Sequence, residues 1–181
     1  MSGILDAFKL DGKVALVTGS ERGLGRGMAV ALAQAGADIV GVTHTAEAPE
    51  TAAAIEATGR KYVHVQANLL SIEPIEGVVA KAVEAFGHID ILVNNAGIIM
   101  RNDSVDFTEK EWDDVMNINV KTVFFMCQAV ARQFIKQGTG GKIVNIASML
   151  SFQGGIRVPS YTASKSGVKG ITMLLANEWA K

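Results

Sequence analysis

The chain has 181 residues, a formal net charge of −1 at neutral pH and a hydrophobic content of 49%. This is enough apolar sequence for one domain with a core, and the near-zero charge gives no electrostatic argument for binding nucleic acid or a membrane surface. No apolar run approaches the roughly 20 residues that span a bilayer, and residues 1–6 lack the basic and apolar regions of a signal peptide. We therefore expect a cytoplasmic protein.

Cysteine and histidine usage gives no sign of a disulfide or a metal site. Cys127 is the only cysteine, so no internal disulfide can form, which fits a reducing compartment. His44, His64 and His88 lie far apart in the sequence, and no cysteine–histidine pair has the spacing of metal ligands. The sequence therefore predicts no metal site.

Short apolar segments alternate with amphipathic ones along the chain. Strands are expected at residues 13–18, 38–43, 62–67, 89–93 and 142–147. Helices are expected from Gly25 to Gly36, at residues 47–58, 72–86 and 109–137 (one helix or two), and from Tyr161 onward. Because each strand is mostly apolar and is followed by a helix, the strands should form a parallel sheet that is covered on both faces.

This alternation predicts an α/β fold with a doubly wound, Rossmann-like parallel sheet in the strand order 3-2-1-4-5. In such sheets ligands bind at the carboxyl ends of the strands, near the point where the strand order reverses. The segments 19–25 and 94–97, Ser148 and Tyr161 all follow expected strands, so we expect them to meet at that edge.

A glycine-rich loop connects the first strand to the first helix. Gly19, Gly23 and Gly25 stand in it, and glycines at such a place turn the chain tightly and let backbone N–H groups approach a pyrophosphate. An ordinary strand-to-helix turn has a similar composition. The loop therefore indicates a dinucleotide site only together with other motifs.

Tyr161 and Lys165 lie four residues apart at the start of the last helix, so their side chains share one helix face. An ammonium at about 4–5 Å favours a phenolate by roughly 3–4 kcal/mol at an effective dielectric constant of about 20. The Tyr161 hydroxyl could then exchange a proton near neutral pH, and Ser148 brings a second hydroxyl from a strand end. Taken alone, the Tyr161–Lys165 pair could be incidental on a surface helix.

The motifs occur in a fixed order: the glycine loop after Thr18, residues 94–97, then Asn119, Ser148 and the Tyr161–Lys165 pair. Together they resemble the short-chain dehydrogenase/reductase family over essentially the whole chain from Gly12 onward. The resemblance implies that Tyr161 is the catalytic acid/base, that Lys165 favours its ionised form and binds the nicotinamide ribose, that Ser148 orients the substrate oxygen, and that Asn119 holds a proton-relaying water.

The resemblance also implies a nicotinamide dinucleotide as cofactor. Its contacts, besides Tyr161 and Lys165, are expected at Gly19, Arg22, Gly23, Leu24, Gly25, Thr43, Asn68, Leu69, Asn95, Ala96 and Gly97. Thr43 stands where NAD-selective members carry an acidic residue for the ribose 2′-hydroxyl, and Arg22 stands where NADP-selective members often carry a base. We expect a slight preference for NAD, with NADP as the alternative.

Residues 87–97, 112–119 and 147–161 resemble the branch of the family that acts on deoxy sugar acids of the deoxygluconate type. This implies hydride transfer between the cofactor and a secondary alcohol or ketone of such an acid. A guanidinium can bind its carboxylate bidentately, so the expected substrate contacts are Ser148, Gln153, Arg157 and Arg101. The alternatives are a reductase of 3-oxoacyl chains or other alcohols and ketones, and a truncated, inactive dinucleotide-binding protein.

The resemblance further implies that residues 1–181 form a single dinucleotide-binding and catalytic domain without the two C-terminal strands and the substrate-covering segment of the family. The fifth strand is then expected to be an exposed sheet edge, and cofactor binding and turnover are expected to be weak. The full-length protein is expected to be a homodimer or homotetramer.

Overall fold

The computed structural model describes residues 3–180 of the chain. These residues form a parallel sheet with helices on its faces. Its five strands have the order β3-β2-β1-β4-β5, and every neighbouring pair is parallel. The strands are β1 (Val14–Thr18), β2 (Asp38–Thr43), β3 (Tyr62–Gln66), β4 (Ile91–Asn94) and β5 (Lys142–Asn145). This confirms the predicted fold class and strand order.

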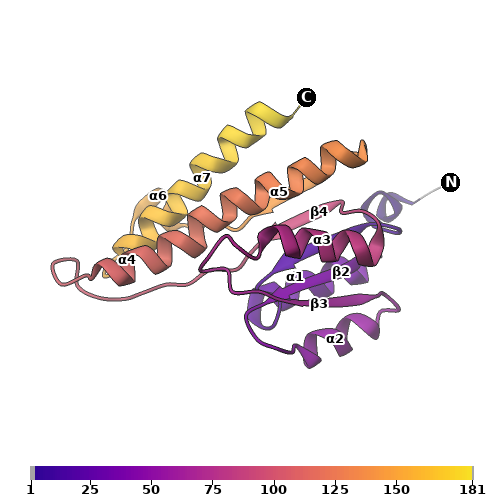
Figure 1. Cartoon of the computed structure of the whole chain (residues 1–181), viewed down its shortest axis with the longest axis horizontal. Coiled ribbons are helices and arrows are strands. Elements are labelled where there is room, and N and C mark those ends of the chain that lie inside the picture. The colour runs from indigo at the N-terminus through magenta and orange to yellow at the C-terminus, as the bar shows by residue number, and fades with distance from the viewer. Residues whose placement is uncertain (1–2, 181) are drawn as a thin grey trace.

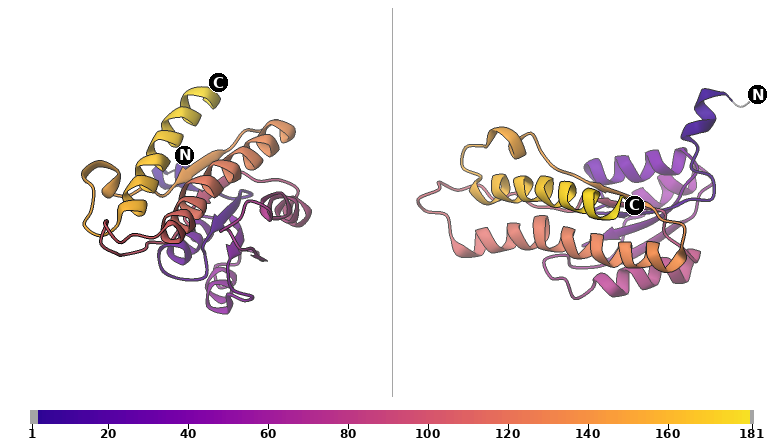
Figure 2. Two further views of the ribbon diagram at one scale, coloured as in Figure 1. Left: turned by 60° about the vertical axis from the view of Figure 1, so that its left-hand side comes forward. Right: turned by 90° about the horizontal axis from the view of Figure 1, so that it is seen from above.

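Helices cover both faces of the sheet (Figures 1 and 2). The helices within residues 3–180 are η1 (Ile4–Phe8), α1 (Gly23–Gln34), α2 (Pro49–Glu56), α3 (Ile75–Phe86), α4 (Glu109–Met116), the π-helical turn η2 (Asn117–Lys121), α5 (Thr122–Gln137), α6 (Leu150–Gln153) and α7 (Pro159–Trp179). Helices α3, α5 and α7 share one hydrophobic cluster, and α1 and α2 share the other. None of these helices, within residues 3–180, is both long and apolar enough to cross a membrane.

Strand β1 lies at the centre of the sheet and is buried along its whole length. Its alternating side chains serve both faces: Leu16 packs in the cluster under α3, α5 and α7, while Ala15 and Val17 pack in the cluster under α1 and α2. A strand that is buried on both sides reads as a continuous apolar run, which is why this strand was predictable. The register also aligns the strand ends, with Asn94 opposite Asn145, so the loops that follow leave from one edge.

Several predicted boundaries were wrong, and prolines explain three of them. Helices α2, α3 and α7 begin at or directly after Pro49, Pro74 and Pro159 rather than at residues 47, 72 and 161. A proline has a helical φ and no N–H to leave unpaired, so it favours a helix start. The short helices η1 and α6 were not predicted, while the expected helix at 109–137 is divided by the turn η2.

Strand β5 is an edge strand among the described residues, because it pairs with β4 alone. Val144 on it is 45% exposed. Helix α7 diverges from α5 toward the C-terminus (Figure 1), and an open groove of about 950 Å³ runs beside β5, with Phe134, Ile143, Leu175 and Trp179 among its walls. The expected exposed edge is therefore confirmed.

Candidate active site

The loops after β1 and β4 are joined at the carboxyl edge of the sheet. The Thr18 hydroxyl accepts hydrogen bonds from the backbone N–H groups of Asn95 and Ala96, both at 3.0 Å. In return, Asn95 Nδ2 donates to the carbonyl oxygens of Thr18 at 3.0 Å and Gly19 at 3.1 Å. The predicted residues Gly19, Asn95 and Ala96 are thus brought together, and Thr18 is the group that holds them.

The glycine loop packs closely against the start of α1, the helix that follows it. A Cβ atom at Gly25 would lie 1.9 Å from the Gly19 carbonyl oxygen and 2.5 Å from Asn95 Nδ2, so no other residue fits there. Gly19 and Gly23 have φ values of 67° and 55°, a region that favours glycine. Helix α1 begins in this loop and presents unpaired N–H groups and the positive end of its dipole. The residues present therefore fit a pyrophosphate.

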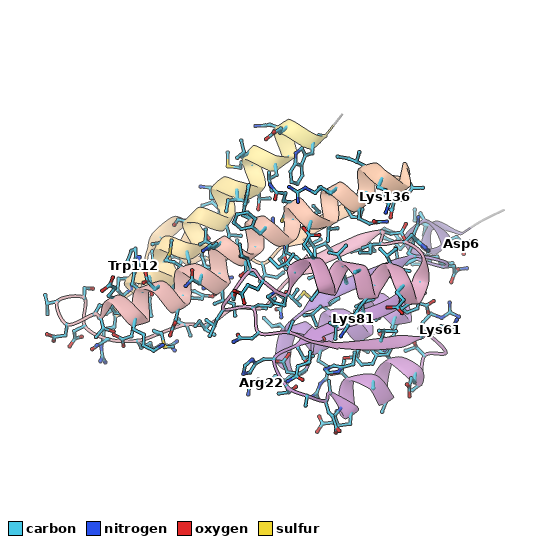
Figure 3. The ribbon with its side chains drawn as sticks, viewed as in Figure 1. Asp6, Arg22, Lys61, Lys81, Trp112 and Lys136 are labelled. Carbon is cyan, nitrogen blue, oxygen red and sulfur yellow. The ribbon has the colours of Figure 1, made fainter. Side chains whose placement is uncertain are left out.

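The end of this edge at β2 and β3, where sequence analysis predicted the adenosine contacts, has few free polar groups. Thr43 is buried, and its hydroxyl donates to the Thr45 carbonyl at 2.8 Å and lies 2.6 Å from His64 Nε2. The side-chain oxygen of Asn68 accepts from the Leu70 N–H at 3.1 Å. Arg22, by contrast, is exposed beside the start of α1 (Figure 3). Among the cofactor residues that sequence analysis predicted here, Arg22 has the accessible charge.

The two remaining predicted neighbours of this loop differ in exposure. Leu24 lies on the first turn of α1 and is 77% exposed. Leu69 is buried, and its carbonyl accepts from the Thr122 hydroxyl on α5 at 2.8 Å. A dinucleotide on this edge could therefore pack on the Leu24 side chain, whereas Leu69 holds the loop after β3 against α5.

Tyr161 and Lys165 occupy the first two turns of α7, and their side chains approach each other. Lys165 Nζ lies 5.7 Å from the centroid of the Tyr161 ring, within the range of a cation–π contact. Lys165 is only 6% exposed, and Nζ donates to the Ile146 carbonyl at 2.6 Å. Burial lowers the pKa of Lys165, because a low-dielectric site disfavours the charged form.

Ser148 is half-buried, two residues after Ile146. Its hydroxyl oxygen accepts from the Leu150 N–H at 3.1 Å, and its own N–H donates to the Ser151 hydroxyl at 3.3 Å. The hydrogen bonds found within residues 3–180 leave the Ser148 hydroxyl hydrogen free to donate. The serine is therefore held in place and can still polarise a carbonyl or carbinol oxygen.

Asn119 lies fully buried in the turn η2. Its side-chain oxygen accepts from the Ile98 N–H at 2.9 Å, and Nδ2 donates to the Ile98 carbonyl at 2.9 Å and to the Ser164 hydroxyl at 3.0 Å. Ser164 in turn donates to the Tyr161 carbonyl at 2.8 Å. The Asn119 side chain therefore braces the loop after β4 against α7, and only its backbone remains for the predicted water.

The contact between the Asn119 side chain and Ile98 requires the small size of Gly97. A Cβ at Gly97 would lie 2.8 Å from the side-chain oxygen of Asn119, so a larger residue would push the amide away from Ile98. The predicted residues Gly97 and Asn119 are thus in direct contact, although sequence analysis had assigned them to separate roles.

The predicted substrate residues lie on the loops that flank this edge. Arg157 has a φ of 62°, its Nε lies 2.9 Å from a carboxylate oxygen of Asp103, and its carbonyl accepts from the Asn102 N–H at 3.1 Å. The loop after β4 and the loop before α7 are thereby tied together. Arg101 is exposed on the loop after β4, and Gln153 is exposed at the end of α6.

Sequence analysis missed Thr18, Ser151 and Ser164, whose hydroxyl groups connect the predicted residues. Ser151 lies three residues after Ser148 and Ser164 three residues after Tyr161, while Thr18 directly precedes the glycine loop. Those short offsets were the available signal. Serine and threonine are frequent at strand ends and helix starts for local reasons, so the signal was weak.

A family model described as short chain dehydrogenase matches residues 13–181 of the chain. A 2-dehydro-3-deoxy-D-gluconate 5-dehydrogenase from Escherichia coli is 64% identical over 178 residues, which cover 98% of this chain and 70% of the relative. A similar solved structure, a proposed 2-deoxy-D-gluconate 3-dehydrogenase from Agrobacterium tumefaciens with bound NADP, has a TM-score of 0.87 and 50% identity and covers 96% of this chain and 68% of its own. Carveol dehydrogenase from Mycobacterium avium in complex with NAD has a TM-score of 0.90 and 30% identity, with coverage of 95% and 67%.

The contact between Gly25 and Gly19 predicts that Gly25→Ala will weaken the binding of NADH and NADPH, measured by nicotinamide fluorescence. The methyl group would displace the Gly19 carbonyl and Asn95, and if binding has to restore their positions, the overpacking cost of about 1–3 kcal/mol raises Kd by roughly 5- to 150-fold. Gly27→Ala is the matched control, because a Cβ at Gly27 meets nothing within 4 Å. Equal losses of affinity in both variants, or no loss in Gly25→Ala, would contradict the proposal that the glycine loop binds the pyrophosphate.

Proposed function

Because this chain belongs to the short-chain dehydrogenase family, we propose that it transfers a hydride between a nicotinamide cofactor and a secondary alcohol or ketone of a deoxy sugar acid. Family membership and the high identity to curated dehydrogenases make it an NAD(P)-dependent oxidoreductase. The substrate class rests on relatives that are 64–65% identical and act as 2-dehydro-3-deoxy-D-gluconate 5-dehydrogenases. The observation that carries the chemistry is the buried Lys165 amine beside Tyr161 and near the Ser148 loop.

In this mechanism the chain's own residues bind the substrate oxygen and move one proton. The Ser148 hydroxyl donates to the substrate oxygen, and Tyr161 gives that oxygen a proton during ketone reduction or removes one during alcohol oxidation. When bound, the nicotinamide ring supplies or accepts the hydride. A proton that leaves Tyr161 leaves a negative charge on its oxygen, which a neighbouring ammonium stabilises.

Lys165 must remain charged to act in this way, although burial lowers its pKa. The Ile146 carbonyl, which accepts from Nζ at 2.6 Å, opposes that effect because a hydrogen bond to the charged form favours it. The Asn119 side chain is already occupied by Ile98 and Ser164. We assign the predicted water to its backbone carbonyl, since a π-helical turn displaces carbonyl groups from the regular helical pattern.

For the cofactor we propose a slight preference for NAD. The chain has no acidic residue at the end of β2, and the exposed Arg22 would favour a 2′-phosphate. Glu21, directly before Arg22 in the same loop, adds a negative charge that opposes a phosphate. The two side chains therefore act in opposite directions, and the difference in affinity between NAD and NADP should be small.

For the substrate carboxylate we propose Arg157 as the main contact and Arg101 as a second one. In the structure Arg157 is paired with Asp103, and both side chains are more than half exposed. An exposed ion pair is worth about 0–1 kcal/mol, so a carboxylate that binds in a less exposed site can replace Asp103 at little cost. The pair thus keeps Arg157 oriented until the substrate binds.

We also propose that the protein assembles as a homodimer or homotetramer. Helices α5 and α7 lie on the same face of the sheet and diverge toward the C-terminus (Figure 1). They carry exposed apolar side chains, Ile135 on α5 and Met173 and Leu174 on α7. A second copy that covers these residues would remove apolar surface from water, and sedimentation of the purified chain would report the assembly.

Tyr161→Phe tests the proposed chemistry. Removing the proton-transferring hydroxyl should lower kcat for reduction of 2-dehydro-3-deoxy-D-gluconate, followed at the nicotinamide absorbance, by about 10²- to 10⁴-fold. The Kd of the cofactor and the thermal unfolding temperature should stay close to those of the parent chain. Full activity of the variant would contradict the role of Tyr161, and faster turnover of a 3-oxoacyl thioester would redirect the substrate assignment.

Arg157→Ala tests the carboxylate contact. Losing a charge-assisted hydrogen bond costs about 1.5–3 kcal/mol, so KM for the sugar acid should rise roughly 10- to 150-fold, with a smaller change in kcat. Asp103→Asn removes the competing carboxylate and should lower KM by up to about fivefold. Asp106→Asn in the same loop is the control and should leave KM unchanged. Unchanged KM in both Arg157→Ala and Arg101→Ala would exclude the contact.

Arg22→Ala tests the cofactor assignment. If the guanidinium meets the 2′-phosphate, the variant should bind NADPH about tenfold more weakly and NADH as before. Glu21→Gln should raise the affinity for NADPH relative to that for NADH, because it removes the negative charge that opposes the 2′-phosphate. Equal changes for both nucleotides would show that neither residue distinguishes them.

A further inference from the structure

One buried hydroxyl connects the two segments that carry the proposed catalytic groups. Ser151, on α6, is 9% exposed, and its hydroxyl donates to the Lys165 carbonyl at 2.7 Å. The same oxygen accepts from the Ser148 N–H at 3.3 Å. A single side chain therefore contacts the backbone of Ser148 on one side and that of Lys165 on the other.

Lys165 is held at two points, its side chain and its backbone. Its side chain is held at the end of β5, where Nζ donates to the Ile146 carbonyl. Its backbone is held by Ser151, which is three residues beyond Ser148. The segment 146–151 therefore contacts Lys165 at both of its ends, and the position of Ser148 relative to α7 depends on both contacts.

Helix α6 has only four residues, so regular hydrogen bonding alone gives it little rigidity. Its docking on α7 depends on side chains. Phe152 lies under Lys169, with Nζ 4.3 Å from the ring centroid, but Phe152 is 74% exposed. The Ser166 hydroxyl lies 3.5 Å from the Ser151 carbonyl, at the limit of a hydrogen bond. The Ser151 hydroxyl makes the shortest and most buried of these contacts.

We propose that Ser151 is a positioning residue, whose hydroxyl sets the distance between the Ser148 hydroxyl and the Tyr161–Lys165 pair. The inference rests on the proposed function, because Ser151 touches neither substrate nor cofactor and acts through Ser148 and Lys165. Its two hydrogen bonds use the hydroxyl once as a donor and once as an acceptor, which is what a serine can supply. An alanine would keep the packing and remove both bonds.

The test compares Ser151→Ala with Ser166→Ala, a change on the same α6–α7 contact that leaves the Ser148–Ser151–Lys165 connection intact. Because a displacement of about 1 Å can cost on the order of 10²-fold in rate, kcat of Ser151→Ala should fall about 10- to 100-fold. The Kd of NADH should change less than about twofold, because most of its proposed contacts lie on the loops after β1, β2, β3 and β4, away from Ser151. Ser166→Ala should keep kcat within about twofold of the parent chain.

A second measurement does not depend on turnover. Hydrogen exchange of the Ser148 backbone N–H should become faster in Ser151→Ala and stay unchanged in Ser166→Ala, because the first variant removes its acceptor. This result tests the positioning role even if Tyr161→Phe shows that the proposed chemistry is wrong. Unchanged exchange in Ser151→Ala would overturn the inference. So would a loss of cofactor binding and thermal stability together with kcat, which would mean that Ser151 supports the fold as a whole.

Discussion

The burial of the Lys165 amine is the constraint on which the rest of the site depends. A buried cation is costly unless protein groups replace the water that it loses, and among residues 3–180 no carboxylate forms an ion pair with it. Its hydrogen-bond acceptor is the Ile146 carbonyl, and the Tyr161 ring lies beside it. An ammonium without a carboxylate partner stabilises a negative charge that develops nearby, which supports the proposed release of a proton by Tyr161.

A series of hydrogen bonds links the glycine loop after β1 to Tyr161, which lies beside the Lys165 amine. It begins where Asn95 holds the glycine loop and continues in the same loop at Ile98, which pairs with Asn119. Asn119 then reaches the Tyr161 backbone through Ser164. Because these hydrogen bonds are buried or part-buried, a shift of the glycine loop would strain the start of α7. The proposed cofactor loop and the proposed proton donor thus belong to one connected structure.

The sequence predicted the sheet order correctly, because apolar strands that alternate with helices leave few topologies. It also named the groups that meet at the carboxyl edge of the sheet. The predicted starts of three helices were wrong, because prolines set them: Pro49, Pro74 and Pro159. The connecting hydroxyl groups were missed because their spacing is not distinctive; they belong to Thr18, Ser151 and Ser164. Asn119 was expected to hold a water, and the contacts of its side chain with Ile98 and Ser164 were not deducible from spacing.

The backbone of Arg157 is in a conformation that disfavours a side chain. A residue other than glycine with φ near 60° costs on the order of 1 kcal/mol, and Gly154 and Gly155 stand only a few residues earlier. Here the Asn102 N–H holds the Arg157 carbonyl at 3.1 Å, and Asp103 holds the guanidinium. Strain of this kind is concentrated at functional sites, and an exposed ion pair is worth too little to account for it. The strained backbone of Arg157 therefore supports the proposal that its side chain binds the substrate carboxylate.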